Sequence, residues 1–498
     1  MSLFKSSFKW AALIIGGPIV LALVALMLLV PLRYAWVEWK GPTVDARHMQ
    51  AKLDYLSALE PVSKDQPNIV LIMFDDLGWG DLSSYGNALI NTPRMDALAE
   101  EGLRMTDFYS ASPVCSPSRA ALLTGRMPPR TRTDKHVFFP SSHPIGAMRR
   151  IMGLANELPK EEITLAEVLK ETGYVTQMVG KWHLGNKEGY RPNDFGFDDW
   201  YGVLHSNDMY PFDLFKNDQV LIQDQRKGGW FAAETDEQNP LPGNGIDQRQ
   251  LTRKYTEEAV SFIQNAEDKP FFLYLAHSLP HVPLYADPEF AGTSEAGVYG
   301  DAVEDLDRST GSILDAIDRA GISENTIVIV TSDNGADYNG SSGHLRGRKQ
   351  QTLEGGQRVP MILRWPGRVE AGTVSSAMAM NTDLFPTLLS LLNIPQPQDR
   401  NIDGTDISGV FLNGTESPHD VLYYFPTIGT EPVAIRNDTF KLSINPKDRG
   451  RRRPHLSRLD LDNEAHDLSA KHVEVLDELI TVLTSKADEV VQNPRGWK

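Results

Sequence analysis

The chain has 498 residues, 41% of them hydrophobic, and a formal net charge of −17. This length and composition are typical of a globular protein with one large domain and one smaller one. The acidic charge argues against a nucleic-acid partner and gives no long-range attraction for a polyanionic substrate, so an anionic ligand has to be captured locally.

The first hydrophobic element is the run of residues 11–32, "AALIIGGPIVLALVALMLLVPL", which carries no charged side chain. As a helix it would be about 33 Å long, enough to cross a bilayer. A cleaved signal peptide is the alternative, but its apolar region is usually shorter and is followed by a small-residue cleavage site. Here "RYAWVEWK" follows, and aromatic residues suited to a membrane interface flank the run: Trp10, Tyr34, Trp36 and Trp39.

We therefore predict a signal anchor over residues 1–40, with its N-terminus in the cytoplasm and the rest of the chain on the exported side (periplasmic, extracellular or lumenal). Residues 41–66 are mixed in character, and we expect them to form a partly helical spacer between the membrane and the folded body. The absence of disulfides does not oppose export, because a large core does not need covalent cross-links.

From residue 67 onwards, helical patterns alternate with apolar strands. The stretch "PNIVLIMFDDLGWGD" is a continuous apolar run that ends in acids, as in a buried parallel strand. Three later strands have the same character: "VTQMVGKWHLG", "PFFLYLAHSLPH" and "TIVIVTSDNG". This alternation predicts an α/β fold with a doubly wound, mostly parallel sheet flanked by helices, in which ligands bind beyond the C-terminal ends of the strands.

After about residue 417 the candidate strands become shorter, "VLYYFP", "PVAIRN" and "TFKLSI", and a long helical pattern closes the chain. We predict a large α/β domain over residues 67–416 and a smaller C-terminal α+β subdomain over residues 417–498. The basic stretch "RGRRRPH", residues 449–455, could bind a polyanionic glycan, although charge runs of this kind are more often solvated loops.

Cys115 is the only cysteine in the chain, which excludes an intramolecular disulfide. It lies in "SPVCSPSRAALLTGR", where Pro117 suits the first turn of a helix and the serines on either side suit its cap. Cys115 is then at or just before a helix N-terminus, where backbone N–H groups stabilise negative charge, and Arg119 adds a cation one turn later. The pattern indicates a site for an anion, or for a nucleophile that becomes one.

The stretch "CSPSRAALLTG" resembles the C-x-P-S-R-x-x-x-L-T-G signature of type I sulfatases, members of the alkaline phosphatase superfamily. In that family a maturation enzyme oxidises the cysteine to formylglycine, an aldehyde that acts as its hydrate. The resemblance is strongest to arylsulfatase A-like members and runs from about residue 67 nearly to the end, where "EAHDLSA" is similar to a common closing element. It implies that Cys115 is the precursor of the nucleophile.

Four oxygen-bearing residues end two of the predicted strands: Asp75 and Asp76 on the first, Asp333 and Asn334 on the "TIVIVTSDNG" strand. Adjacent carboxylates repel unless a cation compensates them, and an all-oxygen set suits Ca²⁺ or Mg²⁺ rather than zinc. Either pair alone is more often a turn. The family resemblance implies that these four, with residue 115, hold a divalent metal ion, with Ca²⁺ favoured over Mg²⁺.

The same resemblance implies roles for cationic side chains. "VGKWHLG" matches the family motif, so Lys181 contacts the nucleophile and sulfate, and His183 orients the hydrate and takes its proton. In "LAHSLPHVPL" the family pattern selects His281 as the acid that protonates the leaving oxygen, and His277 is expected to be packed or one step removed from the substrate. Lys349, five residues before Glu354, binds sulfate in the family pattern, but Arg346 and Arg348 are close competitors for that role.

The implied reaction has two steps. One hydroxyl of the residue-115 hydrate attacks sulfur while the metal, Lys181, Lys349 and Arg119 spread the charge. The second hydroxyl then loses its proton, sulfate leaves and the aldehyde returns. The stretch after the Lys-x-His motif should line the substrate pocket, with His205, Asn207 and Asp208 as candidate substrate contacts or, equally, residues that only shape the loop.

The sequence therefore predicts hydrolysis of an aryl sulfate or a sulfated carbohydrate. Two alternatives remain open. One is a phosphoester or phosphonate hydrolase of the same superfamily, since sulfate and phosphate differ mainly in charge. The other is a membrane-tethered protein that binds sulfated glycans without catalysis, which would not need Cys115, the metal acids and both histidines together.

Overall fold

The computed structural model describes residues 29, 31–37, 39–224, 245–266, 269–445, 453–461 and 463–498. Within those ranges no helix is both long and apolar enough to cross a bilayer. Of the predicted anchor, residues 1–40, the apolar run 11–32 falls outside them except for residues 29, 31 and 32.

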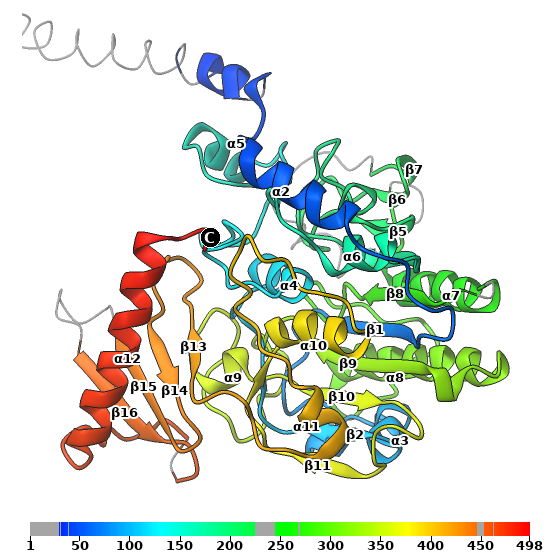
Figure 1. The fold of residues 1–498 in the computed structure, drawn as a ribbon. Coiled ribbons are helices and arrows are strands. Elements are labelled where there is room, and N and C mark those ends of the chain that lie inside the picture. The colour runs from blue at the N-terminus through cyan, green and yellow to red at the C-terminus, as the bar shows by residue number, and fades with distance from the viewer. Residues whose placement is uncertain are drawn as a thin grey trace, which may run out of the picture.

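A ten-stranded sheet forms the centre of the molecule, in the order β11-β2-β10-β9-β1-β8-β4-β5-β6-β7 (Figure 1). Its five middle strands are parallel: β9 (Thr326–Ser332), β1 (Asn68–Phe74), β8 (Phe271–Ala276), β4 (Val175–Lys181) and β5 (Asp199–Val203). The four predicted apolar strands are all among them. The outer strands are short and introduce antiparallel pairs: β10 (Met361–Arg364), β2 (Leu103–Met105), β11 (Thr373–Ser375), β6 (Leu214–Lys216) and β7 (Gln219–Ile222).

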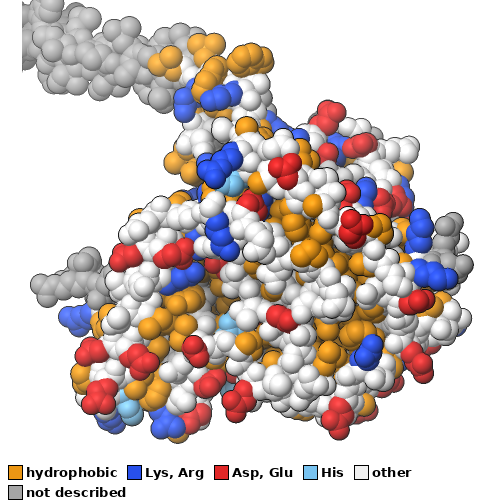
Figure 2. Space-filling model, viewed as in Figure 1, with side chains coloured by type: hydrophobic (Ala, Val, Ile, Leu, Met, Phe, Trp, Pro, Cys, Tyr) orange, Lys and Arg blue, Asp and Glu red, His pale blue; other side chains and the backbone are white. Residues whose placement is uncertain are grey.

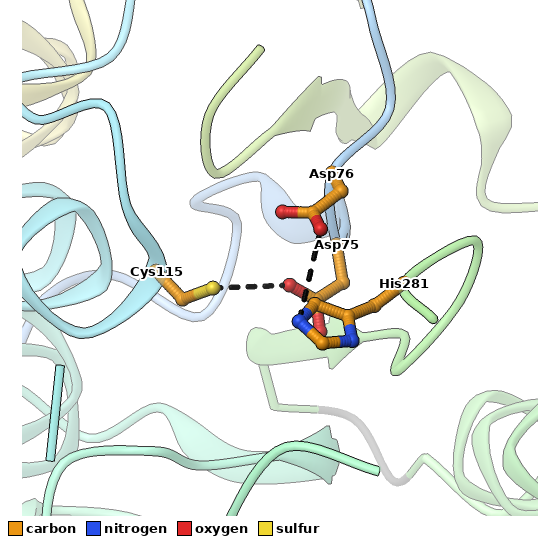
Figure 3. A group of neighbouring side chains, drawn as sticks. All are labelled: Asp75, Asp76, Cys115 and His281. Atoms are coloured by element: carbon orange, nitrogen blue, oxygen red, sulfur yellow. Dashed lines mark hydrogen bonds and ion pairs between the residues drawn. The ribbon is translucent and has the colours of Figure 1, made fainter. Parts of the chain in front are cut away.

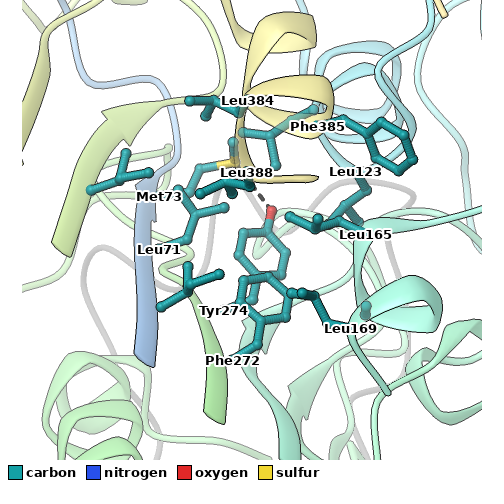
Figure 4. Close-up of a cluster of buried hydrophobic side chains, with 14 of the residues drawn as sticks. Leu71, Met73, Leu123, Leu165, Leu169, Phe272, Tyr274, Leu384, Phe385 and Leu388 are labelled. Carbon is teal, nitrogen blue, oxygen red and sulfur yellow. Dashed lines mark hydrogen bonds between the residues drawn. The ribbon is translucent and has the colours of Figure 1, made fainter. Parts of the chain in front are cut away.

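Helices cover both faces of this sheet, which is why its middle strands are apolar throughout. All seven residues of β1 are buried, and alternate side chains enter the two cores on opposite faces. One face packs against α4 (Cys115–Thr124), α6 (Leu165–Glu171), α10 (Leu384–Leu391) and α11 (Ser408–Asn413). Figure 4 shows this core, with Leu71, Tyr274 and Leu388 meeting from β1, β8 and α10. The other face packs against α3 (Pro93–Glu100), α7 (Leu251–Gln264) and α8 (Gly297–Arg319).

The C-terminal part forms the predicted small α+β unit. Its four antiparallel strands are β13 (Leu422–Tyr424), β14 (Ala434–Arg436), β15 (Phe440–Asn445) and β16 (Arg453–Arg458), and α12 (Val473–Gln492) packs on them. Residues 449–452 of the basic stretch lie outside the described residues. The remaining elements are β3 (Phe108–Tyr109) paired with β12 (Ala379–Met380), α5 (Pro144–Ile151), α9 (Glu354–Gln357), and the short 3-10 helices η1 (Ser83–Tyr85), η2 (Pro192–Phe195), η3 (Gln248–Gln250), η4 (Ser323–Asn325) and η5 (Asn381–Asp383).

The expected spacer is helical over α2 (Ala46–Ser57), and it is docked on the body. Lys52 forms an ion pair with Glu167 and donates hydrogen bonds to the carbonyl oxygens of Lys160 and Glu162. This helix therefore fixes the position of the N-terminal end of the described chain relative to the sheet.

The parallel register brings several strand ends to one edge of the sheet. Phe74 pairs with Ser332, so the residues that follow β1 and β9 are neighbours, and Gly180 pairs with Ala276 at the ends of β4 and β8. The candidate residues predicted at strand ends are therefore gathered at this edge, as the rule for parallel α/β sheets requires.

Candidate active site

Cys115 is the first residue of α4 and is 2% exposed. Its thiol donates to Asp75 Oδ1 over 3.4 Å. The predicted serine cap is wrong: Val114 is the cap residue and makes no side-chain cap hydrogen bond. Both serines serve neighbouring segments instead, since Ser116 Oγ accepts from the N–H of Phe138 and Ser118 Oγ accepts from an asparagine amide.

Three buried carboxylates and two cations surround this thiol. Lys181 Nζ lies 2.5 Å from Asp75 Oδ2. Arg119 reaches back along α4, with Nε 2.9 Å and Nη2 2.8 Å from Asp333 Oδ2 and Nη2 3.6 Å from Asp75 Oδ1. Asp333 also accepts from the N–H of Asp76 through Oδ1. All of these side chains are 0–2% exposed, so their charges act on one another with little solvent screening.

Burial and charge set the protonation of these groups. Burial alone would raise the pKa of Asp75, but the charges of Lys181, His281 and Arg119 hold it well below its usual range. Burial and the neighbouring Asp75 raise the pKa of Asp333 to about 6. Burial raises the pKa of the Cys115 thiol well above its usual value, so at neutral pH the unmodified cysteine is a poor nucleophile.

The cluster has the chemistry of a divalent-cation site. Single ligand atoms of Asp75, Asp76, Cys115 and His281 all lie within 4.8 Å of one another, and Figure 3 shows them converging on one point. Asn334 adds a fully buried Oδ1 with no hydrogen-bond partner, while its Nδ2 donates to Asp76 Oδ1 over 2.8 Å. Carboxylate and amide oxygens are the donors that Ca²⁺ and Mg²⁺ prefer, so the residues present fit a hard cation.

The structure separates Lys349 from its two basic neighbours. Lys349 Nζ lies 2.7 Å from Asp76 Oδ2. Arg348 instead donates to the carbonyl oxygens of Asp337 and Gly340, both over 2.7 Å, and Arg346 donates to that of Glu464. Only the lysine of the three contacts the carboxylate cluster among the recorded interactions of the described residues.

His281 faces Asp76, with Nε2 3.7 Å from Oδ2. Asn207 holds it from behind: Asn207 Oδ1 lies 3.0 Å from His281 Nδ1, and Nδ2 donates to the carbonyl oxygens of His281 and Pro283. Asn207 was a candidate substrate contact, but these hydrogen bonds show that it holds the imidazole of His281 in place.

His277 is packed in the core, as expected. Its ring stacks on Phe74, and its Nε2 lies 3.2 Å from Ser309 Oγ.

The other candidate residues lie around the same edge. His183 follows β4 in a left-handed conformation (φ +59°), and its Nε2 is 3.0 Å from the carbonyl oxygen of Phe138. Burial and the charge of Lys181 lower the pKa of His183 well below its usual value, which favours the neutral ring. His205 packs edge-on against it at 6.4 Å, and burial lowers the pKa of His205 to about 3. Asp208 is half-buried, and its Oδ1 has no hydrogen-bond partner.

Ser206 is a functional candidate that the sequence reasoning missed. Its Oγ accepts from Lys181 Nζ over 3.1 Å and lies 3.2 Å from His281 Nε2, so it lies between the lysine and the imidazole. A serine between two candidate polar residues carries no sequence signal of its own. The only available signal was its place just beyond a strand, β5, which the apolar pattern had not revealed.

Comparison with known proteins places this geometry in a family. The sulfatase family profile matches residues 67–394, and the profile of the C-terminal part of N-sulphoglucosamine sulphohydrolase matches residues 347–444. The N-acetylgalactosamine-6-sulfatase of Canis lupus familiaris is 42% identical over 371 residues, which cover 72% of this chain and 68% of the relative. Mouse arylsulfatase G is 38% identical over 388 residues, covering 72% and 71%.

Comparison with solved structures supports the same family. The chain is similar to the PsFucS1 sulfatase from Pseudoalteromonas sp., with a TM-score of 0.72, 28% identity, and coverage of 90% of this chain and 95% of the other. It is also similar to Ps i-CgsB in complex with k-i-k-neocarrahexaose, with a TM-score of 0.71, 29% identity, and coverage of 87% and 94%. Together with the carboxylate cluster at the N-terminus of α4, these matches identify the chain as a member of the sulfatase family, a type I sulfatase of the alkaline phosphatase superfamily and hence a sulfuric ester hydrolase.

Proposed function

We propose that this sulfatase removes sulfate from a sulfated carbohydrate, with a 6-O-sulfated amino sugar as the first substrate to test. The observation that carries the proposal is the buried cluster in which Cys115, Asp75 and Lys181 meet at the edge of the sheet. The extensive identity to N-acetylgalactosamine-6-sulfatases and the structural similarity to Ps i-CgsB in complex with k-i-k-neocarrahexaose support a sugar ester over a simple aryl sulfate.

Two groups would complete this site. Formylglycine, made from Cys115 by a maturation enzyme, would supply as its hydrate one hydroxyl to attack sulfur and a second whose deprotonation releases sulfate. A divalent cation, for which we propose Ca²⁺, would be held by Asp75, Asp76, Asp333, Asn334 and residue 115, and would supply positive charge to the sulfate oxygens.

The chain's own residues bind sulfate, position the carboxylates and transfer protons. Lys181 and Lys349 each lie against a carboxylate of the cluster, from which they can turn to bind sulfate oxygens. Arg119 holds Asp333 and Asp75 in place through its guanidinium. His281 protonates the leaving sugar oxygen, braced by Asn207, and the neutral ring of His183 accepts the proton that is lost when sulfate departs.

Candidate substrate contacts lie beside this machinery. The free Oδ1 of the half-buried Asp208 can accept a hydrogen bond from a sugar hydroxyl, and the unpartnered ring nitrogens of His205 offer a second polar contact. We propose these two residues, rather than Asn207, as the ones that contact the sugar.

We also propose that residues 11–32 anchor the protein in a membrane with the sulfatase on the exported side. An uncharged apolar run of this length, followed by interfacial aromatic residues, supports the proposal.

The first experiment is to purify the protein from its own membranes and determine the mass of the tryptic peptide "MTDFYSASPVCSPSR", residues 105–119. An aldehyde in place of the thiol is expected. The same preparation is assayed with 6-sulfated N-acetylgalactosamine, an aryl sulfate and an aryl phosphate. Faster turnover of the sugar sulfate supports the proposal. Intact cysteine with no sulfate release would contradict it, and preferential phosphate release would favour the phosphoester hydrolase.

Removal of the metal tests the proposed cation. Dialysis against a chelator should abolish turnover, and Ca²⁺ should restore it better than Mg²⁺, because the oxygen-rich cluster offers more ligands than Mg²⁺ usually takes from a protein. Full activity after chelation, with no bound metal detected by elemental analysis, would contradict the proposed site.

A further inference from the structure

A basic cavity lies at the N-terminal end of the described chain, and none of its lining residues belongs to the catalytic cluster. It has a volume of about 190 Å³ and lies between the helical residues 31–37, the turn that follows them, and the segment around residues 150–160. Five of its lining residues are cationic and one is acidic, and the five cations are Arg33, Lys40, Arg132, Arg150 and Lys160.

Of these five cations, one has an ion pair with a carboxylate recorded among the described residues. Arg150 is paired with the one acid, Glu157. For the other four, no ion pair with a carboxylate is recorded among the described residues: Arg33, Lys40, Arg132 and Lys160. A cavity with this excess of positive charge is suited to a phosphate-type anion, and its presence is unexpected in a protein whose formal net charge is −17.

Exposed apolar side chains surround the cavity. On the first described helix, Trp36 is 49% and Trp39 is 84% exposed, and on the neighbouring α5 segment Met152 is 64% exposed. The two segments are joined, since Arg33 Nε donates to the carbonyl oxygen of Ile151 over 3.0 Å. The apolar set at this end is Leu29, Leu32, Trp36, Trp39, Met148 and Met152. Figure 2 shows hydrophobic and basic side chains side by side at this end of the molecule.

We infer that this end of the protein is a membrane-docking surface, in which the cavity binds the phosphate of an anionic phospholipid and the exposed tryptophans and methionines enter the headgroup region. Aromatic side chains favour that region, and basic residues are attracted to anionic lipid over about a Debye length. The formal net charge of the whole chain is −17, so the cation-lined cavity gives this end a local attraction to an anionic bilayer that the overall charge does not supply. The inference rests on the proposed anchor. It adds that the folded body contacts the membrane surface directly.

The test uses the full chain reconstituted into vesicles of phosphatidylcholine, with or without phosphatidylglycerol. Met152→Cys provides a labelling site for a polarity-sensitive fluorophore, because the native residue 115 is buried. On anionic vesicles the label should shift to shorter wavelength, and its quenching by neutral acrylamide should slow at least about fivefold relative to phosphatidylcholine alone. Val374→Cys is the control: it is exposed on β11, at the opposite end of the molecule (Figure 1), and should remain equally accessible on both.

A second pair of variants tests the cavity itself. Arg132→Gln with Lys160→Gln should remove most of the protection of the Met152→Cys label on anionic vesicles. Arg319→Gln with Lys471→Gln removes the same charge from exposed sites elsewhere and should leave the protection intact. Equal effects of the two pairs, or equal protection with and without phosphatidylglycerol, would overturn the lipid-binding cavity.

Vesicle flotation distinguishes a failure of membrane docking from a failure of the proposed anchor. If the chain floats with the vesicles but the label stays accessible, the anchor stands and docking is wrong. If the chain does not float, anchor and docking both fail. Hydrolysis of a soluble aryl sulfate is measured on the same samples and reports on the reaction independently of either.

Discussion

At the scale of single residues, the site depends on side chains that position others. Asn207 braces His281 from behind, Arg119 braces two carboxylates, and Ser206 lies between a lysine and an imidazole. None of these bracing contacts follows from residue type or spacing, because each joins segments more than 20 residues apart in the chain.

Asn207→Ala tests such a brace. Without the Oδ1 contact the imidazole of His281 keeps only the carbonyl oxygen of Val282 and the hydroxyl of Ser206 near its Nδ1 and is held less firmly, so kcat on a sugar sulfate should fall roughly 10-fold to 100-fold, part of what a general acid contributes. The loss should be smaller on 4-nitrophenyl sulfate, whose leaving group needs less protonation, and KM should change little. Steady-state kinetics on both substrates measures this, with the exposed Asn265→Ala as control. Equal losses on both substrates would argue against a role for Asn207 in leaving-group protonation.

At the scale of elements, β4 delivers Lys181 to the site and depends on a glycine to do so. Gly180 has φ +108°, and a Cβ there would lie 1.9 Å from the carbonyl oxygen of Ala276 on β8. Gly173, just before the strand, has φ +98°, but a Cβ there would meet no other atom within 4 Å, so it shares the backbone strain without the clash.

Gly173→Ala should therefore cost about 1–2 kcal/mol of unfolding free energy, and Gly180→Ala at least about 3 kcal/mol more, or prevent soluble expression. Denaturant unfolding of the two purified variants gives the comparison. If both changes cost the same, the close approach of β4 to β8 does not constrain the strand.

The start of α10 contains a protonation-dependent contact. Asp383 accepts from the N–H groups of Met380 and Thr405, and His419 Nε2 lies 2.8 Å from its Oδ2. Burial would lower the pKa of His419, but the hydrogen bond and charge of Asp383 raise it above its usual value of 6.5. A raised histidine pKa stabilises the fold fully below the unfolded-state pKa, and this contribution is lost as the pH rises through the folded-state pKa.

His419→Gln keeps a donor but removes the charge. It should therefore lower the unfolding free energy by about 1–2 kcal/mol below pH 6.5, with the deficit shrinking as the pH rises above that value. Urea unfolding across this pH range measures the difference. His472→Gln, at a histidine with no ion pair recorded among the described residues, should show no such trend; a similar trend in both would remove the pair as the cause.

At the scale of the whole molecule, a buried ionic network joins α9 to the C-terminal sheet. Glu354 on α9 accepts from Tyr424 over 2.8 Å and Lys441 over 2.9 Å, and Lys441 also pairs with Glu464 over 3.0 Å. Burial would raise the pKa of Glu354, but Lys441 and Arg436 lower it strongly, so the carboxylate stays charged. Glu354, at the centre of this network, follows Lys349 by five residues in the sequence.

Glu354→Gln leaves buried cations without their full countercharge and should lower the unfolding free energy by about 3 kcal/mol or more. Glu101→Gln breaks a surface pair with Arg364 in which the acid side chain is 56% exposed, and should change it by less than about 1 kcal/mol. Thermal and urea unfolding of both variants measures the contrast. A small effect of Glu354→Gln would mean that this network contributes little to holding the C-terminal sheet against α9.

The sequence by itself determined the four apolar strands, the helices between them, the small C-terminal unit and the family. These features depend on hydrophobic periodicity and on a local motif, both of which involve only residues that are close together in the chain. It also named most members of the cluster, since parallel strands end at one edge. Tertiary structure alone decided that Val114 caps α4, that Lys349 and not its arginine neighbours contacts Asp76, that Asn207 braces His281, and that Ser206 belongs to the site. The physical reason is that these outcomes depend on which distant backbone passes close by, and on where each buried polar atom finds its partner.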